Sequence, residues 1–283
     1  ERGAVFRYRS ACARIHLQQG RVGGVELASG ERLPADSVVF NGDVAALRAG
    51  LLGPGSVRAV PRKAPPRSLS AITWSMRAPT QGLALDRHNV FFRADYASEF
   101  TDIFQRQRLP QQPTVYVCAQ DRGGPSVPAG AERLLCLVNA PATGDSEGHG
   151  GHITPEAIEQ CETNTWALLR SCGLNLQPTS QQIVRTTPAD FHHLFPATGG
   201  ALYGRASHGW AASFQRQGPK TRLAGLYCTG GATHPAAGVP MAALSGQLAA
   251  RVIAKDLAST RTSPQAAIPG GMSTRSATTG STG

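Results

Sequence analysis

Long hydrophobic runs are missing from this 283-residue sequence. A transmembrane helix needs about 20 consecutive apolar residues, and no stretch approaches that length. The first residues also lack the apolar core of a signal peptide. We therefore expect a cytoplasmic protein that is soluble or that rests on a membrane surface.

Cysteine spacing typical of a metal site or a disulfide framework is also missing. No Cys-x-x-Cys pair occurs, and the six cysteines stand far apart in apolar segments, at Cys12, Cys118, Cys136, Cys161, Cys172 and Cys228. We interpret them as reduced thiols of the core. His149 and His152 flank two glycines without carboxylate or cysteine ligands nearby, so we expect no metal site.

Lysine is scarce, although the chain carries a net charge of +10. Only three of the 28 cationic residues are lysines, and the arginines are scattered without a basic run or interleaved aromatic residues. We therefore expect no nucleic-acid binding. Contact with an anionic membrane surface stays open, because dispersed arginines on one face would suffice.

Several catalytic motifs are absent from the chain. Without a G-x-S-x-G elbow, a carboxylate pair or a Walker loop, hydrolase and phosphotransfer chemistry has no basis, and Ser245 is interpreted as a small helix residue. The sequence also has no G-x-G-x-x-G, the motif that places a dinucleotide pyrophosphate at a helix N-terminus.

The first part of the chain alternates short strand-like runs with turns. We predict a β-meander with strands at 5–8, 12–17 and 21–27, followed by a buried strand over 35–41. Asp43 then has the N-cap position of a short helix that Gly53 ends.

A Pro/Arg-rich linker over 58–67 leads into a longer middle region. Its predicted elements are strands at 69–76, 89–92, 114–119 and 133–139, a helix over 96–105, and a helix from Thr154 to Gly173. A Ser/Thr/Gly/Pro-rich stretch from Ser259 to the end has almost nothing to bury, so we expect a disordered tail.

The most informative segment combines a strand, a glycine turn and a helix. The predicted strand over 223–230 runs into a turn over 230–235, and the helix begins near Gly238 with Pro240 in its first turn. Such a turn presents free amide groups to an anion or a polarised carbonyl, and its glycines let a planar ring approach the main chain. A tight packing joint of strand and helix explains the turn equally well.

The run GLYCTGGATHPAAGVPMAALSGQLAARVI, however, resembles the C-terminal flavin-binding signature of the phytoene desaturase family, within the amine-oxidase-like flavoproteins. Ala236 stands where that family usually has glycine, and its methyl group would crowd a flavin or change the local φ. The segment FRYRSACARIHLQQGRVGGVELASGERLPADSVVFNGD resembles the family's stretch beside the adenosine and pyrophosphate. The similarity covers residues 3–257 and is strongest to the hydroxycarotenoid 3,4-desaturase branch.

The resemblance implies an α/β (α+β) fold: the C-terminal part of a Rossmann-like FAD-binding domain with a mixed or antiparallel substrate-binding sheet. We divide the chain into part of the FAD domain (1–57), a substrate-binding domain (58–220), the C-terminal FAD-binding strand, turn and helix (221–258) and the tail (259–283). The family's N-terminal βαβ unit is not in the sequence, which begins at Glu1, so we expect a fragment that binds FAD poorly by itself.

The resemblance also implies the site. Its flavin-binding positions are Cys12, Asn41 and Asp43 upstream, and Gly230, Gly231, Ala232, Gly238, Val239, Pro240 and Met241 in the turn and helix. Cys12 stands where a valine commonly contacts adenine through its main chain. His234 is the one titratable residue in the signature, and it would assist proton loss from substrate or stabilise the turn. Several aromatic residues would line a polyene tunnel or belong to an ordinary core, namely Trp74, Phe91, Phe92, Phe195, Tyr203, Trp210 and Phe214.

Three functions follow from the resemblance. The first is an FAD-dependent enzyme that desaturates an acyclic hydroxy- or methoxycarotenoid while it rests on the inner membrane. The second is an isomerase or oxidase of the same superfamily with another lipid substrate. The third is a non-catalytic lipid- or flavin-binding fragment. The sequence leaves the oligomeric state open.

Overall fold

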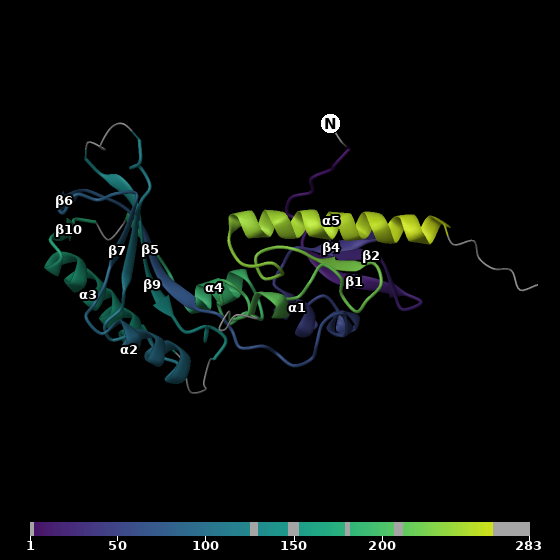
Figure 1. Cartoon of the computed structure of the whole chain (residues 1–283), viewed down its shortest axis with the longest axis horizontal. Coiled ribbons are helices and arrows are strands. Elements are labelled where there is room, and N and C mark those ends of the chain that lie inside the picture. Colours follow the sequence, from purple (N-terminus) through teal and green to yellow (C-terminus); the bar gives the residue numbers. More distant parts are fainter. Residues whose placement is uncertain (1–2, 125–129, 147–152, 179–181, 207–211, 263–283) are drawn as a thin grey trace, which may run out of the picture.

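The computed structural model describes residues 3–124, 130–146, 153–178, 182–206 and 212–262. His149, His152, Trp210 and nearly all of the predicted tail lie outside these ranges. A five-stranded sheet occupies one end of the molecule, and the long helix α5 (Val239–Thr262) lies with smaller strand groups at the other (Figure 1).

The end that carries α5 contains two small sheets. The first has the antiparallel order β1-β2-β3, with β1 (Cys12–Gln18), β2 (Arg21–Leu27) and β3 (Arg32–Pro34). The second pairs β4 (Val38–Phe40) in parallel with β12 (Leu226–Cys228). The meander and the buried return strand predicted from the sequence are therefore present.

Two details of this end differ from the prediction. Residues 5–8 do not form a strand, and Val5, Phe6 and Tyr8 are largely exposed. The first ladder pair of β1 is Cys12 with Leu27, so the strand starts where a partner becomes available.

The helix after Asp43 is also shorter than predicted. The Asp43 carboxylate caps α1 (Val44–Arg48) by accepting a hydrogen bond from the Ala45 backbone nitrogen at 2.8 Å, as the sequence predicted. The helix ends well before Gly53, because the chain turns so that the Leu52 carbonyl accepts a hydrogen bond from Ile15 of β1. A 3-10 helix, η1 (Pro54–Ala59), follows.

The other end is built on an antiparallel sheet with the order β11-β5-β9-β8-β7. Its strands are β5 (Ser70–Ala78), β7 (His88–Phe91), β8 (Val115–Ala119), β9 (Glu132–Ala140) and β11 (Ile183–Thr186). The remaining elements around it are β6 (Thr80–Gly82), α2 (Tyr96–Phe100), the π-helical η2 (Thr101–Gln105), α3 (Pro155–Ser171), β10 (Leu174–Leu176), α4 (Pro188–Leu194) and η4 (Ala212–Gln215).

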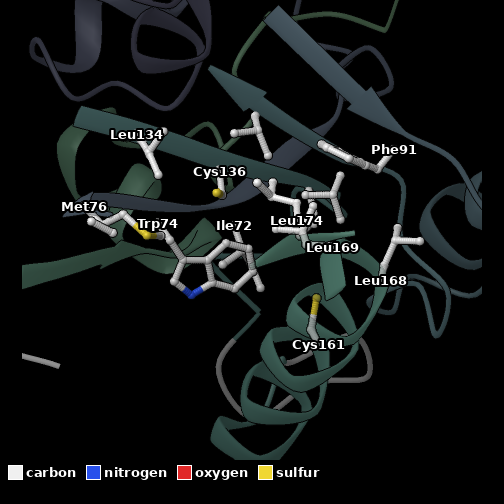
Figure 2. Packing of buried hydrophobic residues seen from close by; sticks show 14 of the residues in the cluster. Ile72, Trp74, Met76, Phe91, Leu134, Cys136, Cys161, Leu168, Leu169 and Leu174 are labelled. Carbon is white, nitrogen blue, oxygen red and sulfur yellow. The ribbon is translucent and has the colours of Figure 1, made fainter. Parts of the chain in front are cut away.

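One face of this sheet packs against α3 and forms the larger hydrophobic core (Figure 2). Alternate residues of β5, including Ile72 and Trp74, meet Cys161 and Leu169 of the helix there. The Trp74 indole nitrogen donates to Glu162 at 3.0 Å, which satisfies its polar atom inside the core. Trp74 and Phe91, considered above as tunnel residues, are thus core residues.

The opposite face of the sheet, here called the open face, carries the alternate side chains. Its central rows contain Leu135 and Leu137 of β9 beside Tyr116 and Cys118 of β8, all half-buried. Val90 of β7 lies opposite Tyr116 at the sheet edge and is largely exposed. The open face therefore presents partly accessible apolar side chains along β8 and β9, beside Thr73 and Ser75 of β5.

All six cysteines are free thiols, but only three occupy the cores. Burial raises the pKa of Cys136, Cys161 and Cys228 to about 12. Cys12 and Cys172 are exposed, contrary to the prediction, because they stand at element ends, Cys12 at the start of β1 and Cys172 as C-cap of α3. Helix α5 also continues to Thr262, beyond the predicted start of the tail.

Candidate functional site

The site begins where two parallel strands end side by side. Phe40 closes β4 opposite Cys228, the last residue of β12, and the Thr229 backbone nitrogen donates to the Phe40 carbonyl at 3.0 Å. Asn41 and Gly230 follow next along their chains. The carboxyl ends of parallel strands in such sheets are where ligands bind. The two segments that resemble the flavoprotein family, far apart in sequence, therefore meet at one edge.

Gly230 is held in a conformation that requires glycine. Its φ is +107°, and a Cβ at this position would lie 2.4 Å from the Asn41 side-chain oxygen. The Thr233 hydroxyl, which is buried, donates to the Gly230 carbonyl at 2.7 Å and closes the turn. Asn41 and the glycine turn are thus packed against each other.

Ser245 of α5 anchors this turn to the helix. Its oxygen lies 2.8 Å from the Gly230 nitrogen, 2.9 Å from the Thr229 hydroxyl and 2.7 Å from the Ala242 carbonyl. A hydroxyl has one proton, so Ser245 donates to Ala242 and accepts from the other two. Ser245 is a helix residue, as predicted, and it also anchors the turn. This second role could not be predicted, because the sequence does not show that Gly230 lies beside it.

Gly231 differs from Gly230 in having space in front of it. A Cβ built on Gly231 would have no heavy atom within 4 Å. Gly238, Val239 and Pro240 are exposed at the start of α5, and Met241 is half-buried. The first amide groups of a helix have no intrahelical partner and favour electron density on a ligand. The main chain at Gly231 and the helix start could therefore hold a planar, electron-accepting ring.

A cavity of about 720 Å³ adjoins this turn. Asp43, Arg67, Gly204, Arg216 and Ala232 are among the residues that line it. Burial raises the pKa of Asp43, although the Ala45 amide and nearby arginines act in the opposite direction. A Cβ on Gly204 would lie within 3.3 Å of both Ala232 and Asp43, so these residues border the same narrow space.

Arg216 is a buried residue that the sequence analysis did not select. Its guanidinium donates to the carbonyls of Gly231 at 3.2 Å, Tyr203 at 2.9 Å and Arg205 at 3.2 Å. It fixes the outer side of the glycine turn to the preceding loop. Nothing distinguishes this arginine in the sequence from the many scattered ones.

His234 is held mainly through its backbone and ring face. Its backbone nitrogen donates to the Gln217 carbonyl at 2.9 Å, and its ring lies 6.3 Å from the Phe214 ring in a stacked arrangement. These contacts agree with a turn-stabilising residue. Its role as a base stays a prediction.

Cys12 lies in β1, in a different sheet from β4 and β12, the strands that precede Asn41 and Gly230. Its thiol donates to the Arg14 carbonyl at 3.6 Å, and burial raises its pKa. The predicted main-chain contact with adenine stays a prediction. Among the described residues, no group of three or more histidines, cysteines and carboxylates could hold a metal ion, and no described helix meets the length and hydropathy needed to span a bilayer.

Residues 1–254 match the family described as flavin containing amine oxidoreductase. The chain is 54% identical to hydroxyneurosporene desaturase of Rubrivivax gelatinosus, over 99% of this chain and 53% of the relative. It is 46% identical to the protein of the same name from Cereibacter sphaeroides, over 92% of this chain and 51% of the relative. The chain thus spans about half the length of these curated relatives. It belongs to the flavin-containing amine oxidoreductase family, in agreement with the resemblance of its turn and return strand to the phytoene desaturases.

Proposed function

We propose that this chain forms the substrate-binding part and one wall of the flavin site of an FAD-dependent desaturase acting on an acyclic hydroxylated carotenoid. The observation that carries the proposal is the meeting of Asn41 with the Gly230 turn at the ends of two parallel strands. The names of relatives with 54% and 46% identity supply the reaction and the substrate class. We also propose that the chain is divided as predicted from the sequence, with the substrate-binding domain lying between residues 58 and 220.

The flavin positions in this proposal lie on main chain. Gly231 and Ala232 would face the ring, and Gly238 to Met241 would direct the first turn of α5 toward it. Asn41 and Asp43 would border the dinucleotide. Bound FAD would supply the hydride acceptor that removal of hydrogen from an unactivated C–C bond requires, since no side chain can accept a hydride.

The protein's own contribution is orientation and electrostatics. Ser245 and Arg216 hold the turn from both sides, so its geometry exists before a ligand arrives. The positive end of the α5 helix dipole would favour negative charge at the ring. The His234 ring stacks on Phe214 through its face, and its action as a base on a substrate proton stays a prediction.

The open face of the large sheet suits a long apolar substrate. Leu135, Leu137, Tyr116 and Val90 present a surface that a polyene would cover in exchange for water. Because such a molecule is dissolved in lipid, we propose that the protein works at the cytoplasmic surface of the inner membrane.

The experiment is to purify the native gene product containing this sequence, reconstitute it with FAD, and add an acyclic hydroxycarotenoid in liposomes. Desaturation lengthens the conjugated chain, so the carotenoid absorption should move to longer wavelength. An unchanged spectrum from a flavin-loaded protein would reject the desaturase and leave another oxidoreductase of the family.

A further inference from the structure

Four aromatic side chains form one continuous ridge that begins just after β7 and continues along α2 and η2. They are Phe92, Tyr96, Phe100 and Phe104, spaced four residues apart. The ring centroids of successive members lie 5.5, 5.1 and 6.4 Å apart, the first two pairs edge to face and the third stacked. We call these four residues the aromatic ridge.

The outer end of the aromatic ridge is directed to solvent. Phe92 is 59% exposed and Tyr96 is 46% exposed. The opposite side of the same segment is fixed in the protein, where Glu99 accepts hydrogen bonds from the Thr114 backbone at 2.8 Å and the Asn139 amide at 2.7 Å. The exposed rings therefore stand on a rigid support.

The charges around the aromatic ridge are unequally distributed. Arg106 and Arg108 both donate to one carboxylate oxygen of Asp102, at 2.8 and 2.9 Å, which leaves a positive excess at that end. Burial alone would raise the pKa of Asp102, but the two guanidiniums outweigh it and keep this pKa below its ordinary value. At the other end the Asp95 carboxylate caps α2 by accepting a hydrogen bond from the Ser98 backbone nitrogen at 3.1 Å. The arginine side chains of the positive end are about half exposed while Asp102 is buried.

We propose that the aromatic ridge is the surface on which this protein rests on a lipid bilayer, with Phe92 and Tyr96 at the level of the headgroups and Arg106 and Arg108 toward anionic lipid. Aromatic rings are enriched at this level of membranes, and interfacial segments combine an apolar edge with basic residues. A net charge of +10 adds a general attraction to an anionic surface.

A bilayer fits this surface better than a second protein chain does. The ridge is a single line of four rings that follow each other at four-residue intervals, whereas a stable protein interface buries a broad patch. The inference deepens the proposed function, because a polyene would be taken from the bilayer. It is tested without FAD or carotenoid, so its failure is distinguishable from failure of the desaturase.

The test measures sedimentation of the native gene product with phosphatidylcholine vesicles that contain phosphatidylglycerol. Phe92→Ser combined with Tyr96→Ser should lower the partition coefficient about tenfold. The matched control is Phe6→Ser combined with Tyr8→Ser, which removes the same exposed ring types from residues outside the ridge and should change binding little. Equal binding of the ridge variant and the wild-type protein overturns the proposal, as does dissociation of a dimer by the ridge variant without loss of vesicle binding.

A second measurement does not depend on removing rings. Tyr96→Trp keeps an aromatic side chain in the ridge, and brominated lipids should quench its fluorescence, whereas they should not quench a tryptophan introduced by Tyr8→Trp. If the protein binds the vesicles but the lipids quench the tryptophan at neither residue 96 nor residue 8, the assignment of this surface is overturned.

Discussion

The hydroxyl of Ser245 lies 2.8 Å from the backbone nitrogen of Gly230 and joins helix α5 to the end of strand β12. Ser245 is almost completely buried, and its three hydrogen bonds use its full capacity at this position. The angle at which the helix leaves the sheet, and with it the direction of the first helix amides, depends on this contact.

Replacing Ser245 with alanine should therefore loosen the turn. The Gly230 amide and the Thr229 hydroxyl would lose a buried partner, at a cost of about 1–3 kcal/mol in the free energy of unfolding. FAD affinity of the native gene product should fall as well, measured by fluorescence titration. Ser259→Ala, at an exposed position of the same helix, is the control and should change neither quantity. Unchanged stability and affinity in Ser245→Ala would mean that the turn keeps its shape without this anchor.

The buried ion pair of Arg122 and Glu132 should make stability sensitive to acid. Arg122 donates two hydrogen bonds to Glu132, at 2.8 and 2.7 Å, and they hold the pKa of this carboxyl below its ordinary value. Because the pKa of Glu132 is lower in the folded state than in the unfolded state, the ion pair contributes its full stabilisation at pH values above the ordinary glutamate pKa. This stability is lost as the pH falls through the lowered value.

Glu132→Gln should cost about 3 kcal/mol at neutral pH, because it leaves the Arg122 charge without its partner. Urea unfolding at neutral and acid pH measures both effects, and the variant should lose less stability than the wild type on acidification. The exposed pair of Arg7 and Glu31 provides the control, since Glu31→Gln should change stability by less than about 1 kcal/mol. Equal losses in the two variants would contradict the buried pair's role.

The open face should determine carotenoid binding without affecting FAD. Leu137→Asn places an amide in its apolar centre and should raise the KM for the carotenoid about tenfold. Leu83→Asn changes an exposed leucine that directly follows β6 and serves as the control. A normal KM in Leu137→Asn, with FAD bound, would place the polyene elsewhere.

Local signals in the sequence were sufficient for much of the fold. Asp43 and Thr154 cap α1 and α3 as predicted, because their side chains satisfy amides only two or three residues away. The alternation of residues in β5 and β9 likewise predicted strands. The predicted strand at residues 5–8 was wrong, since a strand also requires a partner, and sequence periodicity does not supply one.

The candidate site was predictable only in part, because some of its residues depend on partners that are distant in the sequence. The glycine turn and the Pro240 helix start carry local signals, so Gly230 and Gly238 could be selected. Ser245 and Arg216 act through partners brought close by the parallel pairing of β4 and β12 and by the loop before β12. No spacing along the chain encodes those contacts.

The most direct test compares alanine at Gly231 with alanine at a neutral glycine. A Cβ on Gly231 or on Gly124 meets no heavy atom within 4 Å, so both variants should fold with wild-type stability. If Gly231 faces the flavin ring, its methyl group should occupy that space, and titration of the native gene product should show about tenfold weaker FAD binding for Gly231→Ala alone. Identical FAD affinity in Gly231→Ala, Gly124→Ala and the wild type would contradict the flavin wall.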